Sequence, residues 1–128
     1  MVIDASALID ALTSDDDVGD RFRAIMSRPR LAAPEHLLLE TFSGIRGRLL
    51  GGKLDTDEAG QALHDLEHIR VELVPSPLLL GRMWELRDNL TGYDAAYVAA
   101  AEHLDVPLVT GDRKLAGATG PRCEFLVP

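Results

Sequence analysis

The chain has 128 residues, of which 46% are apolar, so it is long enough to form one domain over residues 1–128. A domain of this size buries roughly two-thirds of the surface of its unfolded chain. The net charge of −8 argues against a module that holds nucleic acid by bulk attraction, which relies on Lys and Arg. It does not exclude an enzyme whose acidic residues gather around a divalent cation.

The cysteine content and the apolar runs predict a cytoplasmic protein. Cys123 is the single cysteine, which excludes an internal disulfide and favours a reducing compartment. The first strand is expected to begin at Met1 or Val2, so we expect no signal peptide. The longest apolar runs fall far short of the roughly 20 residues that cross a bilayer, which predicts no membrane segment.

The first stretch, MVIDAS, predicts a buried strand that ends at Asp4, followed by a helix over 7–12. Ligands of open α/β sheets bind at the carboxyl ends of the strands, where Asp4 would lie. Asp and Ser are also common helix caps. Asp4 or Ser6 alone therefore indicates a cap as readily as a functional site.

The next two segments predict a helix and a short strand. Ser14 and three consecutive Asp residues open the helix, where acids complement the helix dipole, and Arg28-Pro29-Arg30 ends it. Residues 31–34 are the predicted strand.

Glu35 to Leu50 predicts a helix that contains Glu40 within an apolar run. Its core face is expected to comprise Leu38, Leu39, Phe42, Ile45 and Leu49. Ser43 and Gly44 lie one turn from Glu40, and such small residues allow another backbone to approach. Glu40 could thus be a functional acid or an ordinary half-exposed glutamate.

The helix from Asp55 to about His68 begins with a variant of the capping box, Asp55 with Glu58. Its residues His64-Asp65-Leu66-Glu67-His68 match the H-x-x-E-H pattern of one zinc peptidase class. No further ligand stands on a suitable downstream helix. A solvated helix face is therefore the favoured interpretation.

A strand at 71–74 and a helix over about 77–90 follow, with Trp84 expected in the core. The sequence TGYD then places Asp94 at the start of an Ala-rich helix. A strand over 106–110 ends before Asp112 and repeats the order strand, acid, helix seen at the N-terminus. A last short strand is predicted at 124–127.

Strands alternate with helices along the whole chain, which predicts an α/β fold with a mostly parallel sheet and helices on both faces. In such a sheet Asp4, Asp94 and Asp112 would meet at one edge, joined by Glu40. Clustered carboxylates repel one another unless a cation neutralises them, and all-oxygen ligands suit Mg²⁺ or Mn²⁺. Such sites activate water for displacement at phosphorus. No histidine pair stands near these acids in the sequence, and no phosphate-binding loop or nucleophile elbow is present.

At these residues the chain resembles the PIN domains, and within them the VapC-type toxins of bacterial toxin–antitoxin pairs. The resemblance covers essentially the whole chain. It is carried by MVIDAS, the helical Glu40 with the Arg46 and Arg48 region, GKLDTDEA, TGYDAAYVAAA and VTGDRKL.

The resemblance implies a three-layer α/β/α fold with about five strands, and a Mg²⁺-dependent endoribonuclease in which Mn²⁺ can substitute. It also implies a homodimer, restrained by a VapB-like antitoxin. Asp4 and Asp94 would be the main metal ligands, with Glu40 and Asp112 completing the catalytic site. The remaining implied roles are hydrogen-bond support from Ser6 and Thr110, and RNA phosphate contacts from Arg113 and Lys114.

Two other classes stay open. A receiver-like phospho-acceptor domain also gathers acids at strand ends, but neither Pro75 nor Lys114 suits the positions at which it needs Asp and Lys. A catalytically silent PIN-like interaction module is the other alternative, and the intact set of four acids argues against it.

Overall fold

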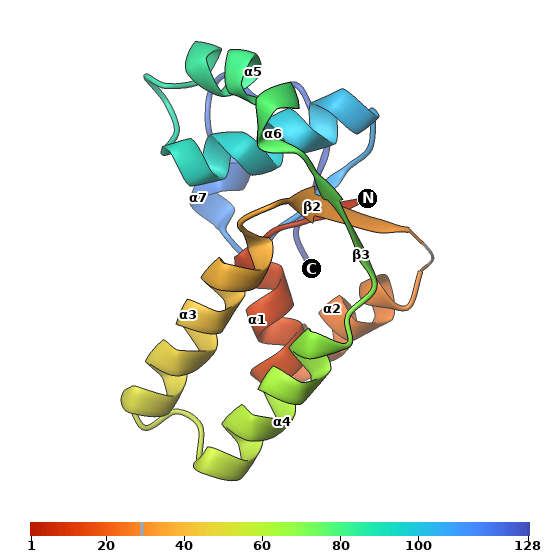
Figure 1. Ribbon diagram of the computed structural model, residues 1–128. Helices are drawn as coiled ribbons and strands as arrows, with labels where there is room; N and C mark the ends of the chain where they lie inside the picture. Colours follow the sequence, from red (N-terminus) through yellow and green to blue (C-terminus); the bar gives the residue numbers. More distant parts are fainter. Residues whose placement is uncertain (29) are drawn as a thin grey trace.

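The computed structural model describes residues 1–28 and 30–128 and contains a five-stranded, all-parallel sheet between two layers of helices (Figure 1). The strands lie in the order β3-β2-β1-β4-β5. They are β1 (Val2–Ile3), β2 (Leu31–Pro34), β3 (Val71–Val74), β4 (Leu108–Val109) and β5 (Phe125–Leu126). This arrangement confirms the predicted α/β fold and its parallel sheet.

Helices α1 to α4 pack together on one face of the sheet, and α5 and α6 cover the other (Figure 1). The helices are α1 (Ala5–Thr13), α2 (Asp17–Met26), α3 (Leu37–Leu50), α4 (Thr56–Glu67), α5 (Leu80–Glu85), α6 (Gly92–Leu104) and α7 (Arg113–Ala116), with a 3₁₀ turn at Ser76–Leu78. Within the described part of the chain, we find no helix with the length and apolar character that crossing a bilayer requires.

Strand β1 occupies the centre of the sheet, and both of its faces are covered. It pairs with β2 on one side and β4 on the other, and both Val2 and Ile3 are fully buried. Strands buried on both faces are continuous apolar runs, as this one is. The central position of β1 places the residue that follows it, Asp4, in the middle of the carboxyl edge.

The carboxyl edge of the sheet gathers the N-terminal ends of four helices. Helices α1, α3 and α7 follow β1, β2 and β4, so each begins at that edge, and α6 runs back along the sheet before β4. Figure 1 shows these four helix starts near one another, between the two helical layers. The partial positive charge of helix N-termini favours carboxylates there.

The predicted core face of α3 was partly wrong. Its buried residues are Leu37, Thr41 and Ile45, whereas Leu39 is 75% exposed and Phe42 is 48% exposed. Apolar residues occur on nearly all sides of the helix start, so residue type alone could not select the packed face. Close approach to α1 selects it, since a Cβ on Gly44 would lie 2.1 Å from Ile9 Cδ1.

The predicted helix over 77–90 was too long, and its tryptophan was misplaced. Helix α5 ends at Glu85, and Trp84 is 68% exposed, with the Arg87 guanidinium 4.5 Å from its ring centre. The chain buries Leu79 and Leu86 instead. Leu79 and Leu86 flank this helix of 6 residues as its N-cap and C-cap, and no residue within the helix itself is buried.

Other boundaries agree closely with the sequence. The capping box at Asp55 and Glu58 is present, with both reciprocal hydrogen bonds. Helix α2 ends at Met26, with Ser27 as its C-cap. Pro29, which was predicted to end this helix, lies outside the described residues.

Candidate functional site

Asp4 is the most deeply buried acid of the site, with 4% of its surface exposed. It caps α1 by accepting a hydrogen bond from the Ala7 N–H at 2.9 Å. Its oxygens also accept hydrogen bonds from the Ser6 hydroxyl at 2.6 Å and from the Thr110 hydroxyl. Asp4 is therefore a helix cap, as one alternative held, but its hydrogen bonds extend well beyond that role.

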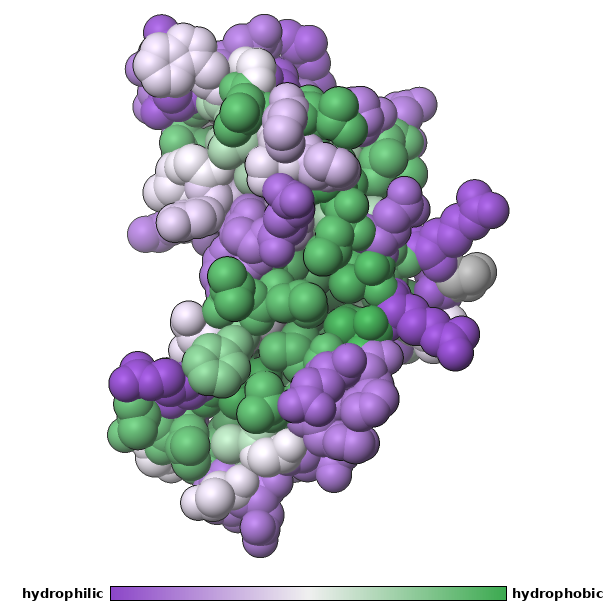
Figure 2. All heavy atoms as spheres, in the orientation of Figure 1, coloured by the Kyte–Doolittle hydropathy of each residue, from purple (hydrophilic) through white to green (hydrophobic). Residues whose placement is uncertain are grey.

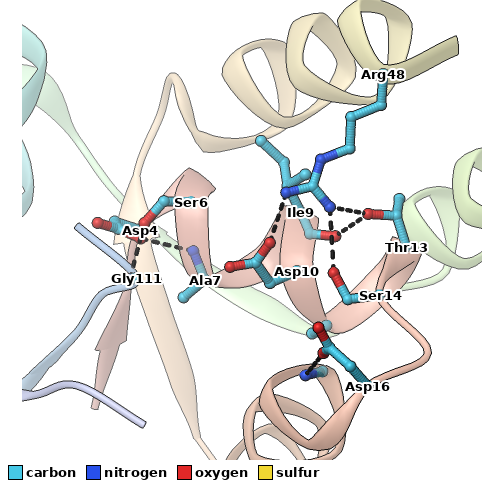
Figure 3. Close-up of polar contacts among 12 residues, drawn as sticks. Asp4, Ser6, Ala7, Ile9, Asp10, Thr13, Ser14, Asp16, Arg48 and Gly111 are labelled. Carbon is cyan, nitrogen blue, oxygen red and sulfur yellow. Dashed lines mark hydrogen bonds and ion pairs between the residues drawn. The ribbon is translucent and has the colours of Figure 1, made fainter. Parts of the chain in front are cut away.

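The two hydroxyls also hold the loop that follows β4 against the start of α1, and Figure 3 shows Gly111 of this loop beside Ser6. Ser6 Oγ accepts a hydrogen bond from the Gly111 N–H at 2.9 Å, and Thr110 Oγ1 accepts one from the Asp112 N–H at 2.9 Å. A single hydrogen-bond network thus fixes the carboxylate of Asp4 and the backbone of Asp112.

Asp112 is the N-cap of α7. Its Oδ1 atom accepts hydrogen bonds from the N–H groups of Lys114 at 2.8 Å and Leu115 at 3.2 Å. Asp112 is half-buried, whereas the side chains of Arg113 and Lys114 are exposed. The second oxygen of Asp112 is left for another partner, and two cations stand beside it in the sequence.

Asp94 is not the cap of its helix. Thr91 is the N-cap of α6, and its hydroxyl accepts the hydrogen bond from the Asp94 N–H at 3.2 Å. Asp94 stands in the first turn of the helix and is half-buried. Its carboxylate is thus not needed to cap α6.

Glu40 lies in the first turn of α3 and is held by two aromatic side chains. The Tyr97 hydroxyl donates a hydrogen bond to Glu40 Oε2 at 3.2 Å. His36 Nε2 lies 3.3 Å from the same oxygen, although its orientation does not make a hydrogen bond. Glu40 is consequently a half-buried acid whose carboxylate is oriented by a hydrogen bond from Tyr97.

Burial and mutual repulsion act on the two central acids. Burial raises the pKa of Asp4, against hydrogen bonds from Ser6, Thr110 and Ala7, and the charge of Asp94 raises it further. Burial also raises the pKa of Asp94, and the charges of Asp112 and Glu40 add to that rise. The four acids are therefore close enough for their charges to interact, as the convergence of their helices requires.

This set of oxygens fits a hard divalent cation. Mg²⁺ and Mn²⁺ bind carboxylate oxygens in preference to nitrogen or sulfur. No three of the four acids bring their oxygens within 4.8 Å of one another in the described residues. Like charges that repel favour such wider spacing. A cation would draw together side chains that already share one edge.

Three side chains on α4 do lie within this distance of one another. His64, Glu67 and His68 on α4 have ligand atoms within 4.8 Å of one another, and all three side chains are exposed. His68 Nδ1 lies 2.8 Å from the backbone oxygen of His64. Their exposure agrees with the solvated helix face predicted for this motif.

Sequence reasoning missed an ion pair beside the acids. Arg48 of α3 donates to Asp10 of α1 at 2.6 Å, and also to the hydroxyls of Thr13 and Ser14 (Figure 3). A Cβ on Gly111 would lie 3.2 Å from Asp10 Oδ2. The pair joins α1 to α3, so no spacing within one helix signals it.

It also missed the aromatic neighbours of Glu40. The His36 ring lies between Tyr93 and Tyr97, with ring centres 5.1 Å and 4.8 Å away. The pairs His36 with Glu40 and Tyr93 with Tyr97 are each four residues apart. That spacing places both members of each pair on one helix face, and was the available signal.

Comparisons with a family model and with known proteins point to the same family. Residues 1–120 match the PIN domain family. The chain is 39% identical to Ribonuclease VapC1 of Mycobacterium tuberculosis, over 97% of this chain and 94% of that protein. It is 35% identical to Ribonuclease VapC9 of the same organism, over 99% of this chain and 97% of that protein.

Solved structures with the same fold include PAE2754 from Pyrobaculum aerophilum, with a TM-score of 0.67 and 27% identity over 91% of this chain and 82% of that one. VapC20 of Mycobacterium tuberculosis, a toxin that cleaves the sarcin-ricin loop, has a TM-score of 0.64 and 18% identity over 91% and 92% of the two chains. VapBC2 from Rickettsia felis, bound to a promoter DNA fragment, has a TM-score of 0.64 at 16% identity over 98% and 96%.

Proposed function

This chain belongs to the PIN-domain family, and on that premise we propose that it is a Mg²⁺-dependent endoribonuclease, the toxin of a VapC-type toxin–antitoxin pair. The observation that carries the proposal is the arrangement of Asp4, Glu40, Asp94 and Asp112 at helix starts along one sheet edge. VapC1 and VapC9 are named ribonucleases, which supports RNA as the substrate.

The residues present fit the cation. Burial and like charges raise the pKa of both Asp4 and Asp94. A positive charge between the two side chains would therefore stabilise their ionised forms. When bound, Mg²⁺ would lower the pKa of a coordinated water and neutralise charge that develops on the phosphate. Mn²⁺ has similar ligand preferences and should substitute.

Each residue has a distinct proposed role. Asp4 and Asp94 are the main ligands, and Glu40 and Asp112 complete the site directly or through water. Ser6 and Thr110 fix the Asp4 carboxylate by hydrogen bonds. Tyr97 orients Glu40. The exposed Arg113 and Lys114, beside Asp112, bind RNA phosphates.

The test is cleavage of single-stranded RNA by the purified protein. Activity should require Mg²⁺ or Mn²⁺, and the products should carry 5′-phosphate and 3′-hydroxyl ends because water attacks the phosphorus. Undiminished cleavage in excess EDTA, or products with cyclic phosphates, would reject the proposal. Mg²⁺ binding without any cleavage would instead indicate the silent interaction module.

For the antitoxin we propose a segment with an apolar anchor and a basic side chain. A groove of about 280 Å³ between α3 and α4 is lined by Phe42, Ile45, Leu49 and Leu63, among others, and Figure 2 shows apolar side chains gathered over these helices. The basic side chain would reach the carboxylates and block them. The name of the structural neighbour VapBC2 supports a VapB-like partner for this chain. Full ribonuclease activity of the toxin–antitoxin complex would contradict this mode of inhibition.

The assembly and location of the protein are also proposals. The resemblance to VapC toxins supports a homodimer. A cytoplasmic location is proposed because the RNA substrate is found in the cytoplasm. Sedimentation of the purified protein should give twice the mass of the 13.9 kDa chain. A monomer over the micromolar range would reject the dimer.

A further inference from the structure

A second groove adjoins the acids, between the start of α3 and the start of α6. It has a volume of about 300 Å³ and is lined by His36, Leu39, Glu40, Ser43 and Tyr93. The molecular surface in Figure 2 is indented between α3 and the end of the molecule that carries α5 and α6. Glu40 belongs both to this groove and to the set of four acids, and Tyr93 directly precedes Asp94. The groove is therefore continuous with the candidate metal site.

The groove has an aromatic wall. The His36 ring packs against Tyr97, which is 1% exposed, and against Tyr93, which is 67% exposed. The Tyr97 hydroxyl donates a hydrogen bond to Glu40. The exposed Tyr93 ring thus packs against a histidine that itself packs against a buried tyrosine. Aromatic rings that are held in place and exposed to solvent are platforms for a flat ligand.

Helix α3 adds an apolar and a polar side chain to the lining of the groove. Leu39 is 75% exposed on α3, which is unusual for a large apolar residue on a helix that packs against α1. Ser43 follows one turn later and is also exposed, so its hydroxyl can donate or accept a hydrogen bond. Apolar walls with a few polar groups are typical of sites for small flat groups.

The overall charge explains why such a platform would be needed. With a net charge of −8, the chain as a whole repels phosphates, so contacts with the bases must supply much of the affinity for RNA. Unpaired bases stack on aromatic side chains whatever their identity, and proteins recognise RNA chiefly through such splayed bases.

We propose that this groove binds one unpaired nucleobase next to the scissile phosphate, with Tyr93 as the stacking residue. The inference rests on the proposed ribonuclease function and adds a binding site for the base. We favour a base over a peptide anchor because the groove shares Glu40 with the acids and has an aromatic and polar lining. The α3–α4 groove offers the more apolar surface for a protein partner.

The test compares three variants of the full-length protein. Tyr93→Ala removes the platform, Tyr93→Phe keeps the ring, and Trp84→Ala removes another aromatic residue of nearly equal exposure, 68%, outside the groove. Tyr93→Ala should weaken binding of a single-stranded RNA roughly 5- to 160-fold, the range measured for loss of one stacked base. The other two variants should bind as the wild type does.

An abasic RNA makes the test specific. An RNA that lacks the base beside the cleaved bond should bind the wild type more weakly, by a factor close to that of Tyr93→Ala. The Tyr93→Ala variant should bind the abasic RNA and the intact RNA equally well. Additive losses, or unchanged RNA binding by Tyr93→Ala, would overturn the inference. So would weaker binding of the antitoxin with RNA binding unchanged, because the groove would then hold the partner.

A separate measurement distinguishes this inference from the proposed function. Mg²⁺ should raise the melting temperature of Tyr93→Ala as much as that of the wild type, because the four acids are intact. If the wild type itself neither responds to Mg²⁺ nor cleaves RNA, the proposed function fails. If it does both and Tyr93→Ala binds RNA equally well, only the base-binding site is rejected.

Discussion

Asp94 separates capping from catalysis at the scale of one residue. Thr91 caps α6, so the carboxylate of Asp94 is not the cap. Burial raises its pKa, as do the charges of Asp112 and Glu40, against a hydrogen bond with Thr91 that lowers it. Asp4 and Asp112, by contrast, cap their helices and line the site at the same time. Asp94 is therefore the acid whose removal reports most directly on the site.

Asp94→Asn should abolish function without loss of stability. RNA cleavage should fall by about 100-fold or more, since several kcal/mol of transition-state stabilisation depend on the cation. The melting temperature in chelator should hold or rise, because one of several crowded charges is gone. Mg²⁺ should stabilise the wild type by mass action and the variant much less.

Thr91→Ala is a control that keeps all four carboxylates but removes the cap of α6 and the hydroxyl beside Asp94. Loss of the cap should lower the free energy of unfolding by about 1 kcal/mol, while Mg²⁺ should still raise the melting temperature because the Asp94 carboxylate remains. Cleavage assays and melting curves with and without Mg²⁺ measure both variants. An active Asp94→Asn protein with a normal Mg²⁺ response would remove Asp94 from the site.

The raised pKa of Asp94 also predicts a pH dependence in the absence of metal. Burial raises the folded-state pKa above the ordinary value of 3.8, so the folded state favours the protonated acid. The resulting stability is present below pH 3.8 and is lost as pH rises through the folded-state pKa. Asn resembles the protonated acid at every pH.

The stability advantage of Asp94→Asn should therefore be near zero at the acid end, grow as pH rises, and then level off. Denaturant unfolding of both proteins in chelator, from about pH 3 to pH 8, measures this difference. The comparison cancels titration of the groups that lie far from Asp94. Loss of the Asp94 charge also reduces the rise in the pKa of Asp4, which acts in the same direction. An advantage that is largest at acid pH would contradict the assigned direction of the shift.

At the scale of elements, α1 and α3 are joined by one apolar and one ionic contact near the site. Gly44 allows Ile9 to pack closely against α3, and Arg48 bridges to Asp10 at 2.6 Å. Asp10 lies beside Gly111, so the same contact borders the loop that carries Asp112. Rigid packing of α1 on α3 keeps Asp4 and Glu40 at a fixed separation.

Arg48→Ala should lower the free energy of unfolding by about 1.5–3 kcal/mol, because a half-buried carboxylate loses a charged hydrogen-bond partner. Arg46→Ala is the control, since Arg46 stands two residues earlier on the same helix and is exposed. Its change should stay within about 0.5 kcal/mol. Equal effects of the two variants in denaturant unfolding would show that the ion pair contributes nothing.

The elements also show what could be predicted from the sequence. The sequence shows where two strands end at an acid, in MVIDAS and VTGDRKL. Buried strands consist of apolar residues and helix caps of polar ones, so the boundary between them is easy to recognise. The edge at which Asp4, Asp94 and Asp112 gather then followed from parallel topology alone. The convergence of these residues needed no knowledge of side-chain packing.

Side-chain packing decided what the sequence could not. The face of α3 depends on Gly44 meeting Ile9 across the helix pair, which no local pattern records. Trp84 was placed in the core by its type, whereas its position on a short helix exposes it. The contact of Glu40 with Tyr97 joins α3 to α6, so only the folded chain reveals it.

At the scale of the whole molecule, an acidic protein must hold a polyanion. The net charge of −8 opposes RNA, and the cations proposed to contact phosphate are the exposed Arg113 and Lys114 beside Asp112. Binding would then depend on few ionic contacts, on a cation at the acids and on stacking at Tyr93. Each of these differs in its response to salt, since only phosphate contacts release counterions from the strand.

Affinity for single-stranded RNA should therefore depend only weakly on salt. Two phosphate contacts predict a slope of log K against log[salt] of about −1.4, from roughly −0.7 for each contact. Titrations with a non-cleavable RNA at several KCl concentrations and constant Ca²⁺ measure this slope. The double variant Arg113→Ala and Lys114→Ala should bring it close to zero. Arg70→Ala, an exposed arginine before β3 and thus at the opposite edge of the sheet, should leave it unchanged. A slope several times steeper in the wild type would mean that many basic residues bind the strand, and a slope unaffected by the double variant would place its phosphate contacts elsewhere.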